Sequence, residues 1–185
     1  YFIMSNSPLL KTIEKMLLSK KNEFNFVLNY REIKNYYQKW VQKNNPKEKN
    51  YFANSIINAV ERNFAFQSFF NVMIYGIILT YDKIAYNPQK AIELFTRAEE
   101  VVQNCDVKSE LKNEVLYFIN IYKGFVYLKE YEYLHSLETF KKALKYNPNG
   151  VTGFFYSALC ARYIDDFDLS FDCLLYTSPS PRDRT

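Results

Sequence analysis

The sequence contains little glycine, proline, histidine and cysteine. Of its 185 residues, 4 are Gly, 6 are Pro, 3 are Cys and 1 is His. So few glycines and prolines argue against a loop-rich or all-β chain. Cys105, Cys160 and Cys173 form no CxxC pair, which argues against a disulfide framework and against a zinc site. We expect buried thiols in a reducing compartment, and therefore a cytoplasmic protein.

Sequence signatures of catalysis are also missing. His135 has no second histidine to work with, and the chain has no Gly-rich phosphate loop, GxSxG or HExxH motif. The carboxylate pairs Glu99-Glu100 and Asp165-Asp166 fall on an expected helix surface and in an expected turn, where carboxylates are ordinarily solvated. We therefore predict no enzyme activity, no cofactor and no metal for this segment.

The charge and hydropathy of the chain exclude little by themselves. A net charge of +4 is too mild to indicate nucleic acid or a membrane surface as a partner. The apolar stretch 64–81 approaches the length of a membrane span, but it includes Gln67 and Asn71 and is followed by Asp82. It is more typical of a core helix, so we expect no membrane span.

The final segment, 173–185, differs from the rest in its Ser, Pro and Arg content. The run from Cys173 to Asp183 resembles a translated transposase sequencing adapter. We interpret 173–185 as a non-native, disordered tail, with a natural Ser/Pro-rich linker as the alternative. With the adapter interpretation, we expect a fragment whose natural sequence continues past about Asp172. The chain begins with Tyr1 rather than Met, so either Met4 is the start or an upstream part is missing.

Apolar residues recur at helical spacing along the chain, and strand-like alternation is not seen. The spacing and the turn signals predict helices at about 8–20, 26–43, 52–64, 69–85, 88–103, 110–131 and 133–146, and from 151 and 167 onward. Asn-Pro pairs end helices or start new ones at 45–46, 87–88 and 147–148. The pattern predicts an all-α fold of paired antiparallel helices.

Segment 117–150 combines small, aromatic and Pro residues in a characteristic order. They are Gly124, Tyr127, Tyr133, Ser136, Phe140, Ala143 and Pro148. This order resembles the tetratricopeptide repeat, a hairpin of two helices. Small residues allow the helices to approach closely, and proline prevents the second helix from continuing. Asn120 and Lys123 depart from the family pattern, which usually has an aromatic residue and Leu there.

Related spacing occurs on both sides of this segment. Matching residues are Phe154, Ala158, Phe167 and Ser170 downstream, and Gly76, Ala91, Phe95 and Ala98 upstream. We therefore predict divergent helical hairpins in 1–65 and repeats in 66–172, the latter at about 70–104, 117–150 and a truncated 151–172. The resemblance implies helix-turn-helix repeats stacked as an α-solenoid, with a generic helical bundle as the alternative.

The resemblance also implies a protein-interaction scaffold whose first helices line a concave groove. The residues expected on that face are Phe118, Ile121, Tyr122, Phe125, Lys129, Phe155, Tyr156, Leu159 and Arg162. Their apolar and aromatic character favours an amphipathic helix or apolar peptide over a C-terminal carboxylate as the ligand. Alternatively, these aromatic residues pack internally.

Two other functions remain open at this point. In the first, the chain is the sensor or docking arm of a larger enzyme or transcription regulator. In the second, the basic segment 30–51, with a local charge of +4, binds nucleic acid or an anionic surface through its lysines, Tyr36, Tyr37 and Trp40. These aromatic residues share a face with Ile33, so we expect them in the core and regard nucleic acid as the less favoured partner. Neither the partner's identity nor the oligomeric state can be predicted.

Overall fold

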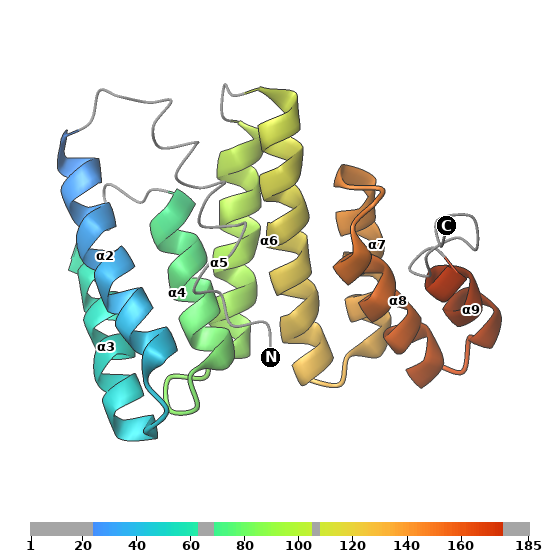
Figure 1. The fold of residues 1–185 in the computed structure, drawn as a ribbon, viewed down its shortest axis with the longest axis horizontal. Helices are drawn as coiled ribbons and strands as arrows, with labels where there is room; N and C mark the ends of the chain where they lie inside the picture. Colours follow the sequence, from blue (N-terminus) through green and yellow to red (C-terminus); the bar gives the residue numbers. More distant parts are fainter. Residues whose placement is uncertain (1–23, 63–68, 105–107, 176–185) are drawn as a thin grey trace, which may run out of the picture. The chain divides into compact units, whose positions relative to one another are not determined.

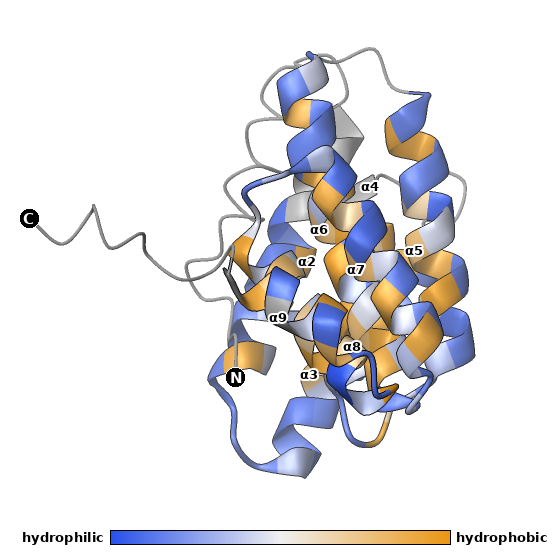
Figure 2. Cartoon of the chain, turned by 90° about the vertical axis from the view of Figure 1, so that its right-hand side faces the viewer, coloured by the Kyte–Doolittle hydropathy of each residue, from blue (hydrophilic) through white to orange (hydrophobic). Residues whose placement is uncertain are grey.

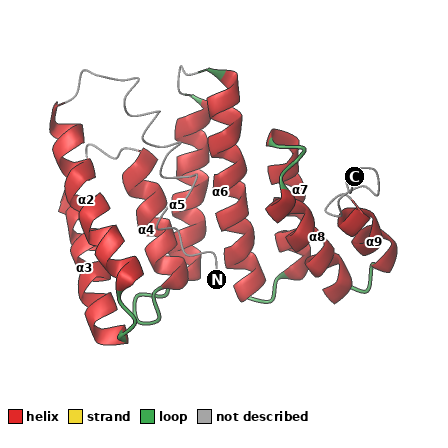
Figure 3. Ribbon diagram, viewed as in Figure 1, coloured by secondary structure: helices red, strands yellow, loops and turns green. Residues whose placement is uncertain are grey.

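The computed structural model describes residues 24–62, 69–104 and 108–175. Every regular element within these ranges is an α-helix, as the sequence predicts (Figure 3). Helices that are close in the sequence pack against one another. Each carries both hydrophobic and hydrophilic residues, coloured orange and blue in Figure 2. The predicted helix at 8–20 lies outside the described residues.

The chain divides by packing into two units, Tyr1–Val115 and Leu116–Thr185. The first contains helices α2 (Phe24–Gln42), α3 (Pro46–Arg62), α4 (Phe69–Tyr81) and α5 (Pro88–Gln103) (Figure 1). The division falls within α6 (Ser109–Lys129). Helices α2 and α3 both pack against α4, which follows the boundary predicted at 65/66.

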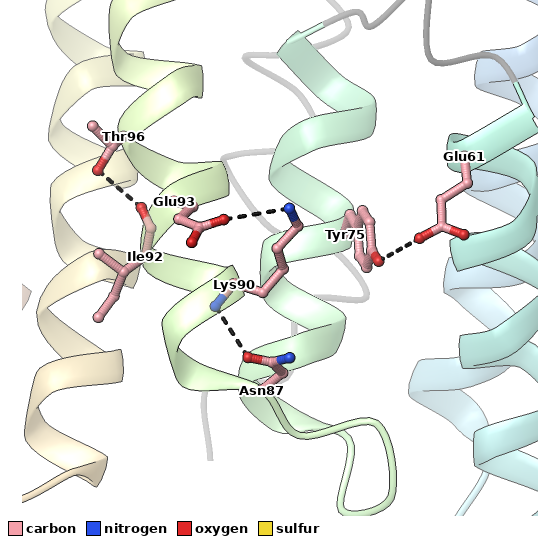
Figure 4. A network of polar contacts seen from close by, with 7 residues as sticks. All are labelled: Glu61, Tyr75, Asn87, Lys90, Ile92, Glu93 and Thr96. Carbon is pink, nitrogen blue, oxygen red and sulfur yellow. Dashed lines mark hydrogen bonds and ion pairs between the residues drawn. The ribbon is translucent and has the colours of Figure 1, made fainter.

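Asparagine and proline define the starts of two helices in the first unit. Asn45 Oδ1 accepts a hydrogen bond from the backbone N–H of Lys47 at 2.9 Å, and α3 begins at Pro46. Asn87 Oδ1 accepts one from Lys90 N at 3.1 Å, directly before α5 (Figure 4). These side chains satisfy N–H groups that have no partner inside the helix, and proline fits the first turn.

The core of the first unit lies where its four helices face one another. Its largest fully buried side chains are Ile33, Tyr37, Ile56, Met73, Ile74, Ile77, Ile78 and Phe95. A polar contact lies beside it, where the Tyr75 hydroxyl donates to Glu61 Oε1 at 2.8 Å, joining α4 to α3 (Figure 4). Burial and the neighbouring carboxylate raise the pKa of Tyr75 to about 12.

A buried carboxylate after α4 ties the first unit together. Asp82 is 2% exposed and accepts hydrogen bonds from Trp40 Nε1 at 2.9 Å and Asn50 Nδ2 at 3.3 Å. It also accepts from the backbone N–H groups of Ile84 and Ala85, both at 3.0 Å. Burial acts to raise the pKa of this carboxyl, but the four donors outweigh it and hold the pKa below its usual value.

The second unit contains most of α6, followed by α7 (Tyr133–Tyr146), α8 (Val151–Tyr163) and α9 (Phe167–Leu175). Short turns connect α6 to α7 and α8 to α9, which makes two antiparallel hairpins (Figure 1). Their core contains Tyr117, Ile121, Leu137, Phe140, Ala143 and Cys160. The observed starts of α7, α8 and α9 are those that the sequence predicts.

The two hairpin turns of the second unit have the same backbone geometry, 34 residues apart. Tyr131 and Asp165 both adopt positive φ, 62° and 60°. Glu132 N donates to the carbonyl of Tyr127 at 2.9 Å, and Asp166 N donates to that of Ala161, also at 2.9 Å. A left-handed residue with this backbone bond is a standard helix ending. The chain therefore repeats one turn with a 34-residue period.

Each unit also contains one glycine pressed against a phenylalanine of the following helix. A Cβ atom placed on Gly124 of α6 would lie 2.6 Å from the ring of Phe140 on α7. One placed on Gly76 of α4 would lie 2.8 Å from the ring of Phe95 on α5. These separations are too short for a carbon atom, so only the hydrogen of a glycine fits at either position. Glycine therefore determines how closely each helix pair packs.

The end of α9 differs from the predicted start of the tail. The sequence predicts disorder from 173 onward, but α9 continues to Leu175 and Cys173 is 7% exposed. Leu174 and Leu175 extend an apolar helix, and the first proline of the tail comes only at Pro179, so the chain has no early stop signal. The remaining residues, 176–185, lie outside the described part.

Candidate partner-binding faces

The nine residues predicted to line a groove differ in how much surface they offer. Ile121 and Tyr122 on α6 are buried, at 4% and 7% exposure. The half-buried members are Phe118, Phe125, Tyr156 and Leu159, and the exposed members are Lys129, Phe155 and Arg162. A partner could therefore reach Phe155, which is 50% exposed, far more readily than the apolar positions of α6.

The half-buried aromatic residues of this face pack against one another. The ring centroid of Phe125 on α6 lies 4.6 Å from that of Tyr156 on α8 and 5.5 Å from that of Phe140 on α7. Phe140 and Tyr156 stack at 5.5 Å. One side of the predicted face thus joins three helices, as the internal-packing alternative expects. What remains accessible is the strip of Phe155, Leu159 and Arg162 on α8, with Lys129 at the end of α6.

Below this face, a chain of hydrogen bonds links the same three helices. Ser136 Oγ on α7 donates to the carbonyl of Gly124 at 2.9 Å, and Cys160 Sγ on α8 donates to Ser136 Oγ at 3.3 Å. Burial raises the pKa of the Cys160 thiol, against a smaller opposing effect of the Ser136 hydroxyl. A buried thiol with a raised pKa is a poor nucleophile, so Cys160 has a structural role.

A second exposed surface lies at the turns of the second unit. We call it the aromatic edge and define it by Tyr131, Tyr133, Leu134, Tyr163, Ile164 and Phe167. Tyr133 and Tyr163 stack with ring centroids 4.4 Å apart, and Tyr131 meets Tyr133 edge-on at 6.3 Å. The sequence predicts Tyr133 and Phe167 only as repeat positions. The available signal for the edge is that Tyr131, Tyr133 and Tyr163 lie in or beside predicted turns.

Two aromatic residues of the basic segment 30–51, Tyr37 and Trp40, are buried in the first unit. Tyr37 and Trp40 are 2% and 5% exposed, and the Trp40 indole donates to Asp82 as described above. Lys49 Nζ lies over the Trp40 ring, 4.3 Å from its centroid. Lys43 pairs with Glu48 at 2.7 Å. Tyr37 and Trp40 therefore offer no open ring face for bases, and the prediction that they belong to the core is confirmed for these two. Tyr36 is half-buried.

The described residues offer neither a group of metal ligands nor a helix that could span a membrane. In the ranges 24–62, 69–104 and 108–175, no three or more His, Cys, Asp or Glu side chains are grouped so as to hold a metal ion. Within the same ranges, no helix combines the length and the apolar character needed to cross a bilayer.

Comparison of the chain with models of known protein families and with curated proteins finds no match in either case.

Proposed function

We propose that the chain is a tetratricopeptide-like helical-repeat module that binds a peptide or helix of a partner protein and performs no catalysis itself. The observation that carries the proposal is the 34-residue recurrence of one turn, with the same positive φ and the same backbone hydrogen bond in both copies. A period of this length, with one hairpin per period, is typical of the tetratricopeptide repeat.

The close glycine–phenylalanine contacts support the same proposal. Gly124 against Phe140 and Gly76 against Phe95 place a small residue of the first helix opposite an aromatic residue of the second. This is the arrangement that the repeat pattern requires of those positions. Finding it in both units favours stacked hairpins of one kind over a bundle whose hairpins are unrelated.

The proposed binding face is the accessible strip on α8. Phe155 supplies exposed aromatic surface, Leu159 is half-buried beside it in the helix, and Arg162 adds a charge one turn further on. An exposed ring flanked by half-buried apolar residues suits the apolar side of an amphipathic helix. The same strip would serve if the chain is the docking arm of a larger enzyme or regulator, which stays a prediction.

Selection of peptides from a random display library on the full chain tests this function. We expect enrichment of apolar, helix-forming peptides whose affinity falls about tenfold with Phe155→Ala, because exposed aromatic anchors dominate such interfaces. Tyr51→Ala is the matched control, since Tyr51 is another exposed aromatic residue, on α3 of the other unit, at 66% exposure. Failure to enrich any peptide, or equal loss with both variants, would contradict the proposal.

A further inference from the structure

The aromatic edge exposes more apolar surface than the strip on α8. Five of its six side chains are exposed: Tyr131 at 77%, Leu134 at 57%, Tyr163 at 55%, Phe167 at 54% and Ile164 at 37%. They come from the two turns of the second unit and from the helix ends beside them. Clustered exposed apolar residues of this kind mark interaction sites more often than scattered ones do.

Tyr131 is an unusual residue for its position. Its φ of 62° lies in the left-handed region, where a bulky side chain is unfavourable and glycine or asparagine is usual. The equivalent position in the next turn is Asp165, a residue that tolerates this conformation. The chain thus holds Tyr131, the most exposed aromatic side chain among those that the structure describes, in a strained conformation, at a place where a smaller residue would fold more easily.

The charge around these rings is opposite to that of the whole chain. Segments 129–135 and 162–168 contain five carboxylates and two cationic side chains, a net charge of −3, whereas the chain carries +4. The carboxylates, all exposed, are Glu130, Glu132, Asp165, Asp166 and Asp168. Glu132 contacts His135 Nδ1 at 2.9 Å, Asp166 accepts from Leu169 N at 3.1 Å, and Glu130 interacts with the cationic side chain of Lys129.

We propose that the aromatic edge binds a short basic segment of a partner protein, with arginine preferred over lysine. A planar guanidinium can stack on the exposed face of Tyr131 or Tyr163 and pair with a carboxylate beside the ring. A purely apolar helix would desolvate those carboxylates without supplying cations to pair with them. A nucleic acid would be repelled by them. The six side chains that define the edge are not those of the α8 strip, so the inference does not depend on the function proposed there.

Fluorescence anisotropy of the full chain with a short labelled peptide of alternating Gly and Arg tests this inference. We expect saturable binding that weakens with added salt, is weaker for the matched Gly-Lys peptide and is absent for Gly-Glu. Tyr131→Asn should weaken the binding of the Gly-Arg peptide about tenfold, since it removes one cation–π partner. Asparagine suits the left-handed conformation, so this variant should remain folded.

Two further variants separate the edge from general attraction of a cationic peptide. Asp165→Asn combined with Asp168→Asn should also weaken the peptide, whereas Glu138→Gln, an exposed carboxylate in the middle of α7, should not. Tyr51→Ala in the first unit should have no effect. Equal binding of the three peptides, or equal affinities for Tyr131→Asn and Tyr51→Ala, would overturn the proposal.

Discussion

Gly124 lies in the interior of α6, where glycine is a poor helix former, and the ring of Phe140 faces it. Two opposing effects therefore determine what alanine would do there. Alanine would gain about 1 kcal/mol of helix propensity. Its Cβ would also lie 2.6 Å from a fully buried aromatic ring that has no room to move. Overpacking of this kind costs about 1–3 kcal/mol, so the steric effect should win.

We therefore expect Gly124→Ala to destabilise the chain by about 1 kcal/mol, measured by chemical denaturation. The double variant Gly124→Ala with Phe140→Leu should recover part of that loss beyond what the two single variants predict, because leucine vacates the volume that Cβ needs. A Gly124→Ala variant more stable than the parent chain would show that the close approach is not real.

Tyr131 leads to the opposite expectation. Replacing it with glycine removes the Cβ that makes the left-handed conformation unfavourable, so Tyr131→Gly should stabilise the chain by about 0.5–1 kcal/mol. Asp165→Gly, at the equivalent position, should gain less because aspartate already tolerates this conformation. Thermal denaturation of both variants measures the difference. A loss of stability in Tyr131→Gly would mean that the tyrosine ring contributes more than its backbone costs.

At the scale of helices, Asp82 connects two elements to the loop that follows α4. Trp40 reaches it from α2 and Asn50 from α3, while the loop supplies two backbone donors. Asp82→Ala would leave these buried donors without an acceptor. We expect a loss of about 2–4 kcal/mol in the stability of the first unit, measured by denaturation followed through Trp40.

The same carboxylate should make the first unit sensitive to acid. Its pKa is lower in the folded chain than the value of about 4 expected in the unfolded chain. The stabilisation is therefore fully present above about pH 4 and is lost as pH falls through the folded pKa. Asp82→Asn, which does not titrate, should be less stable than the parent at neutral pH and show a weaker decline below pH 4. Parallel pH profiles for the two would contradict this.

Helix positions could be predicted well from the sequence because their signals are local. Asn-Pro pairs and apolar spacing predict the starts of α5 and α7 to within a few residues. For α3, the apolar row begins only at Phe52, whereas the helix starts at Pro46. The last residues of α9 differ from the prediction because Leu174 and Leu175 resemble part of an adapter and are therefore predicted to belong to the tail. Pairing of distant residues, such as Trp40 with Asp82, leaves no local signal at all.

The candidate site was predictable only in part, and for the same reason. Spacing places Phe125, Tyr156 and Phe155 on one face of their helices, but it cannot say which of them a neighbouring helix covers. That depends on how closely α6, α7 and α8 approach one another. Gly124, which faces the ring of Phe140, and Ser136, which donates a hydrogen bond to the Gly124 carbonyl, determine this approach. The aromatic edge depends on the left-handed conformation of Tyr131, which tyrosine rarely adopts, so the residue type does not predict it.

For the whole molecule, the division into two units predicts that a destabilising substitution in one unit mainly destabilises that unit. Asp82→Ala should speed amide hydrogen exchange in α2–α5, and Gly124→Ala should speed it in α7–α9. In a repeat array, stability is a sum of unit and neighbour terms, so each variant should have a smaller effect on the other unit. Hydrogen exchange followed by mass spectrometry measures this directly. Uniform acceleration by either variant would indicate a single cooperative unit.

Trp40 is the only tryptophan in the chain, and it is buried in the first unit. Indole emission is therefore a spectroscopic reporter of that unit alone, with a blue-shifted maximum while the ring is enclosed and a red shift when it opens to water. The second unit contributes no indole emission, whereas tyrosine emission comes from both units, since Tyr37 and Tyr75 belong to the first. A change in indole emission that precedes or follows the change in tyrosine emission therefore shows whether the first unit loses its structure before or after the rest of the chain, without any label.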